Sequence, residues 1–388
     1  MVAYDPFDYH YHDDPYPHYR ALRDEAPAYF NEKHGVWFIS RYADCQKAVR
    51  DFKTFSSAGS ITLEPIREEQ PSVQSSDPPD HTRLRHLMMG MFTPDAVAYL
   101  EESIRRMAID LLTPFLESGR IDIIGDFSAR LPMAIICRML GFPREDEDML
   151  RHLTDLVVHR EDGVFGMPEE GGKATRALCD YFENALRERE GQPPRADLVA
   201  RLAAAEKAGQ LSHAELIAYL FILSIAGNET TTKLIGNIVY QLHRHPAQRD
   251  ALAADPSLVS SAVEETLRFD GPSQMLARGI TRDVELHGKT LRAGQKVGLL
   301  FIAANRDERH YADAETFDIW RNPRDHLGFG SGLHACLGAA LARLEARVAM
   351  EEILRLMPDF EVDEAGLARM HSPSVRGYTR VPLAFTNR

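Results

Sequence analysis

The sequence predicts a mainly α-helical protein with small β-sheets, an α+β fold, in one large domain covering residues 1–388. Apolar residues recur every three to four positions through a helical body at about 93–270. Alternating apolar and polar residues mark β-rich parts at about 28–40, 277–303 and 357–388. The 388 residues and an apolar fraction of 44% suffice for a large hydrophobic core.

Composition and charge exclude several classes of protein. The chain has 45 Lys and Arg against 58 Asp and Glu, a net charge of −13, which argues against a general nucleic-acid binder. The most apolar run, Leu216 to Ala226, is too short for a bilayer that needs about 20 residues, so we expect no membrane partner. Four widely spaced cysteines without a CxxC pair predict free thiols and a cytoplasmic location.

The first eighty residues predict short elements and one long loop. A helix is expected over 15–25, which opens with prolines. Residues 28–31 and 36–40 predict a hairpin that turns at His34-Gly35. Residues 56–80 are rich in Ser, Pro, Glu and Gln and predict a loop, which at this length is often functional.

The helical body contains several amphipathic segments and one long buried helix. The amphipathic segments are expected over 94–117, 127–140, 145–158 and 172–190, and the polar stretch 189–195 is interpreted as a surface loop within the same domain. Ser212 and Glu215 form a capping-box pattern at the start of a helix that runs to His245, where Pro246 ends it. This helix would be about 50 Å long. Because its middle is apolar on nearly all faces, it is expected to pass through the core of a single domain.

The last third of the chain returns to strand patterns. Residues 277–291 alternate around a turn at His287-Gly288, residues 295–303 form a second apolar run, and residues 357–388 alternate with Pro and Gly breaks. Between them, residues 337–357 have the pattern of a strong helix.

The loop before that helix is the most distinctive motif. Residues 329–338 read FGSGLHACLG, so three glycines flank Cys336 at the start of a helix, where free N–H groups favour a thiolate. A thiolate on a glycine-rich loop suits haem ligation by Cys. The alternatives are a buried structural cysteine, or a nucleotide-binding loop that here lacks its strand and lysine.

This loop resembles the haem-binding loop of the cytochrome P450 family, including Phe329 seven residues before the Cys. Glu265 and Arg268 match the family's ExxR motif, and Arg321 occupies the place of the third member of its triad. Residues 226–230 (AGNET) match the oxygen-activating AGx(D/E)T segment. The resemblance covers essentially the whole chain and implies the cytochrome P450 fold, with haem b between the long central helix and the helix after Cys336, its metal ligand.

The resemblance also implies an activity and its partners. A bacterial-type haem-thiolate monooxygenase would take two electrons from a ferredoxin or flavodoxin, ultimately from NAD(P)H, to activate dioxygen. It would hydroxylate or epoxidise a hydrophobic small molecule, in secondary metabolism or catabolism. The alternatives are a peroxide-driven peroxygenase and a non-enzymatic haem binder or sensor. The Glu229-Thr230 pair argues against both, because neither alternative has a use for it.

The catalytic residues implied are Ala226, Gly227, Glu229 and Thr230. Thr230 would hold dioxygen and water by hydrogen bonds, Glu229 would pass protons inward, and Gly227 would let the helix open locally. The local alternative is a Thr hydroxyl bonded to a carbonyl one turn back, beside a Glu at a helix irregularity.

The cofactor contacts implied are four cationic residues and parts of the Cys loop. His81, Arg85, Arg278 and His334 match family positions that contact haem propionates, and Arg83 should point elsewhere. Phe329, Gly330 and Gly338 shape the loop. The triad of Glu265, Arg268 and Arg321 is expected to be a buried support for the loop rather than catalytic, although an isolated ExxR is more often an exposed pair.

Two surfaces complete the predictions. Several basic residues are expected on the face of the molecule nearest Cys336, where they would steer an acidic redox partner: Arg83, Arg105, Arg106, Arg343 and Arg347. By resemblance, the substrate pocket would include Leu223, Met275, Leu276 and Val375, although each is equally well explained as core.

Overall fold

Helices make up most of the structure, a computed structural model that describes residues 2–59, 61–64, 72–193 and 195–386. The α-helices are α1 His10–Asp13, α2 Tyr16–Glu25, α3 Tyr42–Arg50, α4 Asp80–Met89, α5 Pro94–Val97, α6 Glu101–Leu112, α7 Arg130–Leu140, α8 Glu147–Val158, α9 Glu169–Glu188, α10 Leu198–Lys207, α11 His213–Ala226, α12 Glu229–Arg244, α13 Pro246–Ala254, α14 Val259–Phe269, α15 Phe301–Asn305 and α16 Ala339–Leu356. The predicted mainly α fold with small sheets is confirmed.

The strands form small sheets. The five-stranded sheet has the order β1-β2-β8-β5-β3, in which β2 and β8 are parallel and the other neighbours are antiparallel. Its strands are β1 Ala28–Asn31, β2 Val36–Ile39, β3 Phe55–Ser56, β5 Met275–Ile280 and β8 Lys296–Leu300. The smaller sheets contain β4 Arg120–Asp122, β9 Phe360–Val362 and β12 Pro382–Phe385; β6 Val284–Leu286 and β7 Lys289–Leu291; and β10 Ala368–Arg369 and β11 Tyr378–Arg380.

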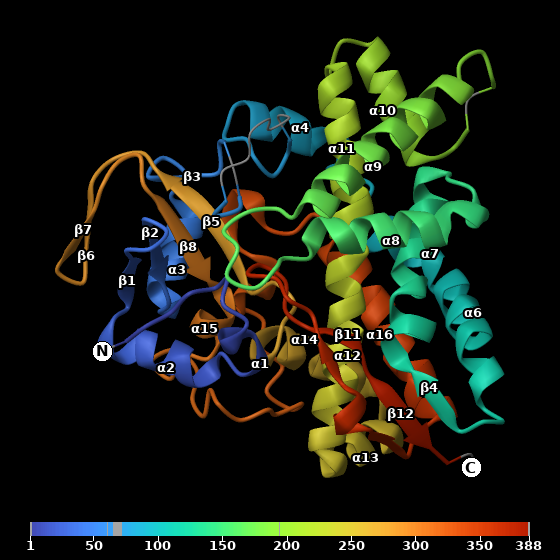
Figure 1. Cartoon of the computed structure of the whole chain (residues 1–388). Helices are drawn as coiled ribbons and strands as arrows, with labels where there is room; N and C mark the ends of the chain where they lie inside the picture. The colour runs from blue at the N-terminus through green and yellow to red at the C-terminus, as the bar shows by residue number, and fades with distance from the viewer. Residues whose placement is uncertain (1, 60, 65–71, 194, 387–388) are drawn as a thin grey trace.

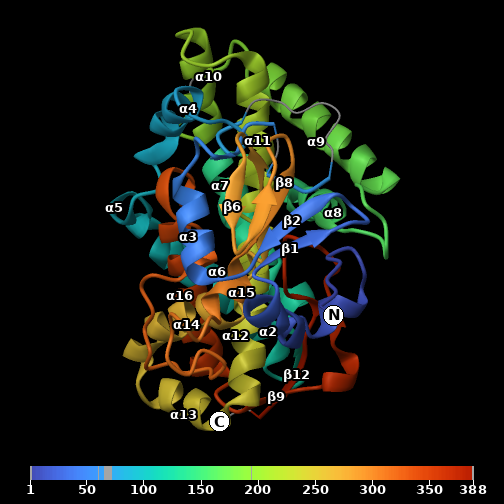
Figure 2. The same cartoon turned by 90° about the vertical axis from the view of Figure 1, so that its left-hand side faces the viewer.

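The sheet and the helical body occupy different sides of the molecule. Figures 1 and 2 show the five-stranded sheet with α2 and α3 on one side, and α6 to α10 on the other side of the central helices α11 and α12. Segments from the first and last thirds of the sequence meet in the sheet, since β2 pairs with β8 and β3 pairs with β5.

Several local predictions are confirmed. The hairpin of β1 and β2 turns at Gly35, whose φ is +68°. The second turn is made by His287 and Gly288, with φ of +49° and +71°. Positive φ strains residues that carry a Cβ, so glycine suits both turns. Of the predicted 56–80 loop, residues 60 and 65–71 lie outside the described part, and its last residue already belongs to α4.

Other predicted boundaries are wrong. The 94–117 segment is divided into α5, α6 and 3₁₀ turns, and α7 begins at Arg130 after a π-helical segment, Ile123–Ser128. The 295–303 run is a strand only to Leu300 and then becomes α15. Short apolar runs do not distinguish a strand from a buried helix, which explains the last error.

The central helix is not continuous, contrary to the prediction for 212–245. Its capping box is present, since Glu215 N–H donates to Ser212 Oγ at 3.3 Å and Ser212 N–H donates to Glu215 Oε2 at 2.7 Å. However, α11 ends at Ala226 and α12 starts at Glu229. Gly and Asn at 227 and 228 are poor helix formers. Asn228 also uses its side chain to reach Thr154 Oγ1 at 3.3 Å. The two helices nevertheless follow one another along a common line (Figure 1).

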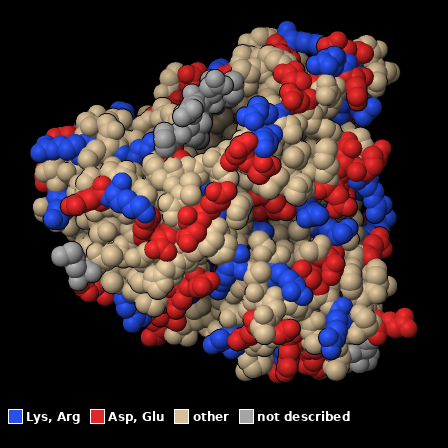
Figure 3. Space-filling model, viewed as in Figure 1, with Lys and Arg blue, Asp and Glu red and all other residues tan. Residues whose placement is uncertain are grey.

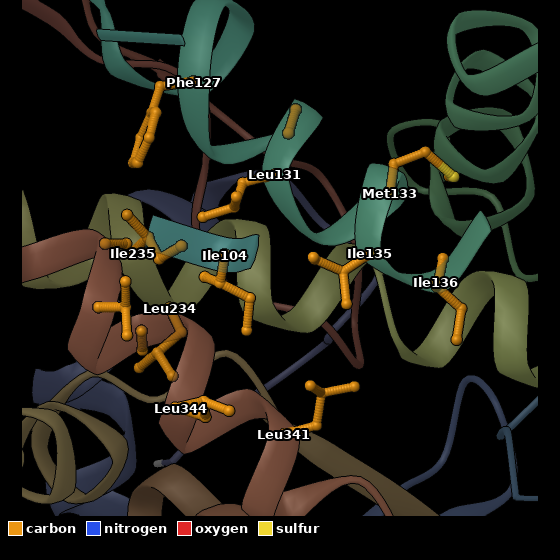
Figure 4. Packing of buried hydrophobic residues seen from close by; sticks show 14 of the residues in the cluster. Ile104, Phe127, Leu131, Met133, Ile135, Ile136, Leu234, Ile235, Leu341 and Leu344 are labelled. Atoms are coloured by element: carbon orange, nitrogen blue, oxygen red, sulfur yellow. The ribbon is translucent and has the colours of Figure 1, made fainter. Parts of the chain in front are cut away.

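The main core lies where α6, α7, α12 and α16 converge. Figure 4 shows side chains from these helices in contact: Ile104, Leu131, Ile135, Leu234, Ile235, Leu341 and Leu344. Residues from both α12 and α16 are in this cluster, so the central helix and the helix after Cys336 are packed through one core. This packing fixes the positions of α12 and α16 relative to each other. The cofactor was predicted to lie between the central helix and the helix after Cys336.

Charge and hydropathy agree with the composition. In Figure 3, basic and acidic side chains are interspersed, and this face shows no continuous basic surface. None of the helices in the described ranges has both the length and the apolar character that crossing a bilayer requires.

Candidate functional site

The Cys loop is held in a conformation that requires glycine. Gly330 has a φ of +66° and Gly332 a φ of +71°. A Cβ on Gly332 would lie 3.3 Å from Val49 O, so this glycine also permits close packing on α3. Cys336 N–H donates to Phe329 O at 2.8 Å, which closes the loop. The helix starts two residues later than predicted, with Gly338 at its N-cap.

Cys336 is an exposed residue, although protein atoms surround its thiol closely. Burial raises the pKa of Cys336, while the Gly338 amide and the charges of Arg85 and Arg343 act to lower it. The features predicted to favour a thiolate are therefore present but are outweighed by burial. Coordination to a metal ion deprotonates a thiol outright.

Two histidines, one on α4 and one within this loop, have buried ring nitrogens without a hydrogen-bond partner among the described residues. The rings of His81, on α4, and His334 are 4.2 Å apart between centroids. Neither ring nitrogen of His81 has a partner within the described residues, and the same holds for Nε2 of His334. Buried polar atoms in proteins are nearly always satisfied, so these orphaned nitrogens point to a ligand that completes the site.

Two arginines, Arg278 and Arg85, join His81 and His334, and these four residues are called the cationic cluster below. Arg278 is 3% exposed, and within the described chain no carboxylate lies at ion-pair distance from it. Burial lowers the pKa of Arg278 to about 10, against the opposing effect of Asp77. Arg85 Nη2 donates to Ala335 O at 2.7 Å, beside Cys336. Burial, followed by the charges of Arg278, His81 and Arg85, lowers the pKa of His334 to about 3.

The cationic cluster has the character of an anion site next to a sulfur ligand. Its members come from α4, β5 and the Cys loop, so parts of the chain far apart in sequence converge here. Burying a positive charge is costly unless an anion accompanies it. A thiol, two arginines and two histidines with unpaired ring nitrogens fit a haem, whose iron takes a thiolate and whose two propionates take cations and hydrogen-bond donors.

The segment at the helix interruption holds the predicted catalytic residues. Thr230 Oγ1 donates to Ala226 O at 2.9 Å, which is the local alternative considered for this hydroxyl. Ala226 is exposed although it lies at the junction of the central helices α11 and α12. It therefore borders an accessible space. A Cβ on Gly227 would lie 2.8 Å from Leu223 O and 3.5 Å from Ile136, which explains a glycine here.

Glu229 is a buried carboxyl with charged neighbours. Its side chain is 2% exposed, and its Oε2 lies 3.4 Å from Nζ of Lys233. Asn228 Nδ2 donates to Oε1 at 3.3 Å. Burial raises the pKa of Glu229 to about 8; Lys233 acts to lower it and Asp155 acts to raise it. The group is therefore able to gain and lose a proton near neutral pH.

The structure brings the three members of the ExxR triad together. Arg268 donates to Glu265 through Nε at 2.8 Å and Nη2 at 2.7 Å, and both side chains are fully buried. Arg321 Nε lies 3.4 Å from Glu265 Oε1. Arg268 also donates to the carbonyls of Asn305 and Ala314. Asn305 in turn accepts from Leu327 N–H at 2.7 Å, which connects the network to the segment preceding the Cys loop.

The predicted basic surface is largely neutralised. Arg105 contacts Glu351 at 2.6 Å and Glu352 at 2.7 Å. Arg347 contacts Glu101 and Glu351, Arg343 contacts Glu264, and Arg106 lies 3.8 Å from Glu102. Arg83 points away from the cationic cluster, as expected, and pairs with Glu215. These arginines are not the free positive charges that the sequence suggested.

One predicted pocket residue is misplaced. Met275 and Ala277 pack into a core cluster with Tyr4 and Phe38, whereas Leu276 and Arg278 lie on the opposite face of β5. Successive side chains of a strand point to opposite faces, so Met275 cannot share the Arg278 side. Leu223, on α11, is 9% exposed, and Val375 forms a bridge with Ser273. Leu223, Leu276 and Val375 stay predicted pocket residues, and Met275 does not.

Sequence reasoning missed two charged neighbours of Glu229. Lys233 was detectable, because a residue four positions after Glu229 shares its helix face. Asp155 lies on α8, and nothing local in the sequence connects it with α12.

Comparison with known proteins identifies the family of the chain. The family described as Cytochrome P450 matches residues 170–366. Cytochrome P450 130 of Mycobacterium tuberculosis is 37% identical over 96% of this chain and 96% of its own length. Vitamin D(3) 25-hydroxylase of Pseudonocardia autotrophica is 37% identical over 95% of this chain and 93% of its own length. CYP109E1 from Bacillus megaterium, solved in complex with testosterone, has a TM-score of 0.89 at 32% identity and covers 96% of this chain and 97% of its own.

The relatives cover nearly the whole chain at 37% identity, and the solved structure shares its fold. Together with the thiol, the cationic cluster and the buried triad, they establish what kind of protein this is. The chain belongs to the cytochrome P450 family of monooxygenases, oxidoreductases that carry a thiolate-ligated haem b and draw their electrons from NAD(P)H.

Proposed function

We propose that this monooxygenase uses dioxygen and two electrons from a ferredoxin or flavodoxin to hydroxylate or epoxidise a hydrophobic small molecule. The observation that supports it most is the combination of the Cys336 loop with a buried, titratable Glu229 at a helix interruption. A peroxide-driven peroxygenase or a haem sensor would leave Glu229 and Thr230 without a use.

In this proposal, Cys336 is the metal ligand and the cationic cluster holds the propionates. Among the described residues, His81 and His334 present nitrogens without protein partners, and Arg278 lacks a carboxylate. Phe329 receives the Arg343 guanidinium 4.5 Å from its ring centre, and Gly330 and Gly338 set the shape of the loop. When bound, the thiolate-ligated haem supplies dioxygen activation and oxygen transfer.

The proton-handling residues are Glu229 and Thr230. Thr230 donates to Ala226 O, which leaves the lone pairs of its hydroxyl oxygen free to accept a further hydrogen bond. Glu229 holds a proton near neutral pH and can release it. The interruption at Gly227 separates the two helices at this point, so that backbone and side chain groups can bind water there.

The triad of Glu265, Arg268 and Arg321 is proposed to support the Cys loop. Its hydrogen bonds stay within the protein, and Asn305 connects it to Leu327. A supporting role fits the complete burial of Glu265 and Arg268.

The proposed substrate is apolar and of the size of a steroid or secosteroid. The predicted pocket residues Leu223, Leu276 and Val375 are aliphatic. Two similar proteins are described with such molecules, vitamin D3 and testosterone. Action in bacterial secondary metabolism or catabolism, and a cytoplasmic location, are part of this proposal.

Turnover assays test the proposal. Testosterone and vitamin D3 serve as probes, first for a shift of the haem spin state on binding and then for oxygenated product. A ferredoxin or flavodoxin with its reductase and NADPH should form product that contains one atom from labelled dioxygen. Product formed from peroxide alone, and none with the reductase system, would favour the peroxygenase instead.

The Thr230→Ala variant tests the proton-handling role of Thr230 separately from haem binding. The variant should keep its haem and consume NADPH, but divert electrons to hydrogen peroxide because dioxygen and water lose a hydrogen-bond partner. Thr231→Ala is the matched control, since Thr231 is the neighbouring threonine of α12 and is itself buried. Fully coupled product formation by Thr230→Ala would refute the role of Thr230.

A further inference from the structure

The first residues of the chain are bound to segments that are far away in the sequence. Residues 5–13, called the N-terminal strap below, contact the connection between α8 and α9. Gly163 N–H donates to Phe7 O at 2.7 Å, and Tyr9 N–H donates to Asp162 Oδ1 at 2.9 Å. In Figure 1, the green connection between α8 and α9 reaches the blue N-terminal part of the chain.

Two histidines meet where the strap contacts a segment near the C-terminus. The Nδ1 atoms of His12 and His371, called the histidine pair below, are 3.4 Å apart. The ring of Tyr9 stacks on His371, with centroids 3.6 Å apart and planes 7° from parallel. Tyr9 OH donates to Arg160 O at 2.6 Å, and Arg160 N–H donates to His371 O at 3.0 Å. The strap, the α8–α9 connection and the C-terminal segment therefore hold one another at this pair.

The contacts of His12 decide which ring nitrogens carry hydrogens. Its Nε2 is 2.8 Å from Pro6 O, which only accepts, so Nε2 carries a hydrogen. In the neutral pair, Nδ1 of His12 is then an acceptor, and His371 donates to it through its own Nδ1. One added proton is tolerated, because a charged His371 still donates to a neutral His12. Two added protons place N–H groups against each other across 3.4 Å, so the hydrogen bond is lost.

The surroundings of the pair disfavour its protonation. Burial lowers the pKa of His12, against the hydrogen bond to Pro6 O and with the charge of Arg376, whose Nη1 donates to His12 O at 2.7 Å. Burial, followed by the charge of His12, lowers the pKa of His371. The other titratable groups that face the two rings are Tyr9, Asp13, His159 and Asp162. Both rings are therefore neutral at neutral pH.

We propose that the histidine pair is a pH-sensitive contact that holds the N-terminal strap in place and releases it when both rings are protonated. The α8–α9 connection then loses its contacts with the strap. Because the pKa values of both rings are lowered by folding, the stabilisation is complete above the ordinary value of 6.5 and is lost as the pH falls through the folded-state values.

The segments held by the strap include residues that were predicted to be functional. Val375, a predicted pocket residue, lies four positions after His371. Arg160 donates through Nε to Glu64 at 2.7 Å, and both residues are buried. Glu64 belongs to the predicted loop over 56–80. Weaker binding of an apolar probe at acid pH is therefore a further consequence, and this consequence rests on the proposed function.

Asparagine can replace either ring without leaving two titratable groups in contact. Its amide reaches the position of a histidine Nδ1 and can donate or accept, so His371→Asn keeps a partner for His12 in both of its charge states. His12→Asn does the same from the other side, although the Nε2 contact is lost. His18→Asn is the matched control, since His18 lies near the same end of the chain and packs on the rings of His10 and Tyr11, at 5.6 and 4.6 Å.

The test is hydrogen exchange of backbone amides in the haem-loaded protein at about pH 7.5 and about pH 5. Each rate is divided by the rate of an unstructured peptide at the same pH, which gives a protection factor. For the amides of Gly163 and Tyr9, this factor should fall about tenfold at the lower pH in the wild type and in His18→Asn. It should stay within about twofold of its neutral value in His371→Asn and His12→Asn.

Two results would overturn the inference. One is a wild-type protection factor that is equal at the two pH values. The other is an acid-induced loss of protection in either asparagine variant of the pair that is as large as in the wild type. Because the two variants alter different rings, the test does not depend on the folding of one of them.

Binding of testosterone, followed by the haem spin state, is the second readout. Its dissociation constant should rise several-fold at the lower pH in the wild type and in His18→Asn, and less in His371→Asn. If acid lowers protection as expected but changes the binding by the wild type and by His371→Asn equally, the strap opens as proposed and the pocket of the proposed function is wrong. If protection does not change, the inference about the strap fails and the proposed function is unaffected.

Discussion

Glu265 allows a quantitative prediction about stability. Its carboxylate is fully buried and accepts hydrogen bonds from Arg268 at 2.8 and 2.7 Å, from Asp318 N–H at 3.0 Å, and from Arg321 at 3.4 Å. In Glu265→Ala, the Arg268 guanidinium would stay in the core with carbonyl partners but no counter-charge. Breaking a buried pair in this way costs about 3–5 kcal/mol.

This loss is large compared with the total stability of a domain, which is about 5–15 kcal/mol. We expect Glu265→Ala to unfold at a lower urea concentration and to retain little haem, because the network also connects to the segment before the Cys loop. Equilibrium unfolding and haem content per chain measure the two effects. Glu102→Gln is the control, since Glu102 belongs to an exposed pair with Arg106 and should change neither.

The result that would refute this reasoning is specific. If Glu265→Ala unfolds within about 1 kcal/mol of the wild type and binds a full complement of haem, the triad is not the buried support that its geometry indicates.

Two further predictions concern the helix interruption and acid stability. Gly227→Ala should destabilise the protein by about 1–3 kcal/mol, because the new Cβ would lie 2.8 Å from Leu223 O. Gly90→Ala is the control, since a Cβ at Gly90 would meet open space. Equal urea midpoints of unfolding for the two variants would contradict this prediction. Burial alone raises the pKa of Asp270, but Arg376 and then Arg369 and Tyr16 lower it to about 2. A lowered folded-state pKa adds stability that is complete above the unfolded value near 3.8 and is lost as pH falls through about 2. The difference in unfolding free energy between wild type and Asp270→Asn should therefore shrink from pH 4 to pH 2, and a constant difference would refute it.

Local patterns predicted much of this fold. The hairpin at Gly35, the turn at His287-Gly288 and the capping box at Ser212 each depend on residues close together in the sequence. Such features can be inferred from propensity and periodicity alone. The interruption at Gly227 was hidden, because an apolar pattern continues across both helices while the side chain of Asn228 and the packing of Ile136 decide the break.

The candidate site likewise contains residues that the sequence identified and residues that it did not. The Cys loop and the ExxR pair are sequence motifs, and their residues were identified directly. The partners of Glu229 were not, because Asp155 reaches it from another helix. The error at Met275 came from assigning a whole segment to the pocket, although alternate residues of β5 face opposite ways. The arginines near the Cys side were also overestimated as free charge, since tertiary contacts supply glutamates that the sequence does not place beside them.

The central claim is that Cys336 is the thiolate ligand of a haem. The most direct measurement is the absorption spectrum of the reduced protein bound to carbon monoxide, in the wild type and in Cys336→Ser, with Cys179→Ser as a control at a free, half-buried thiol on α9. The account predicts the long-wavelength band of thiolate ligation in the wild type and in Cys179→Ser, and its loss in Cys336→Ser. A wild-type spectrum without that band, or a Cys336→Ser spectrum that keeps it, would contradict the account.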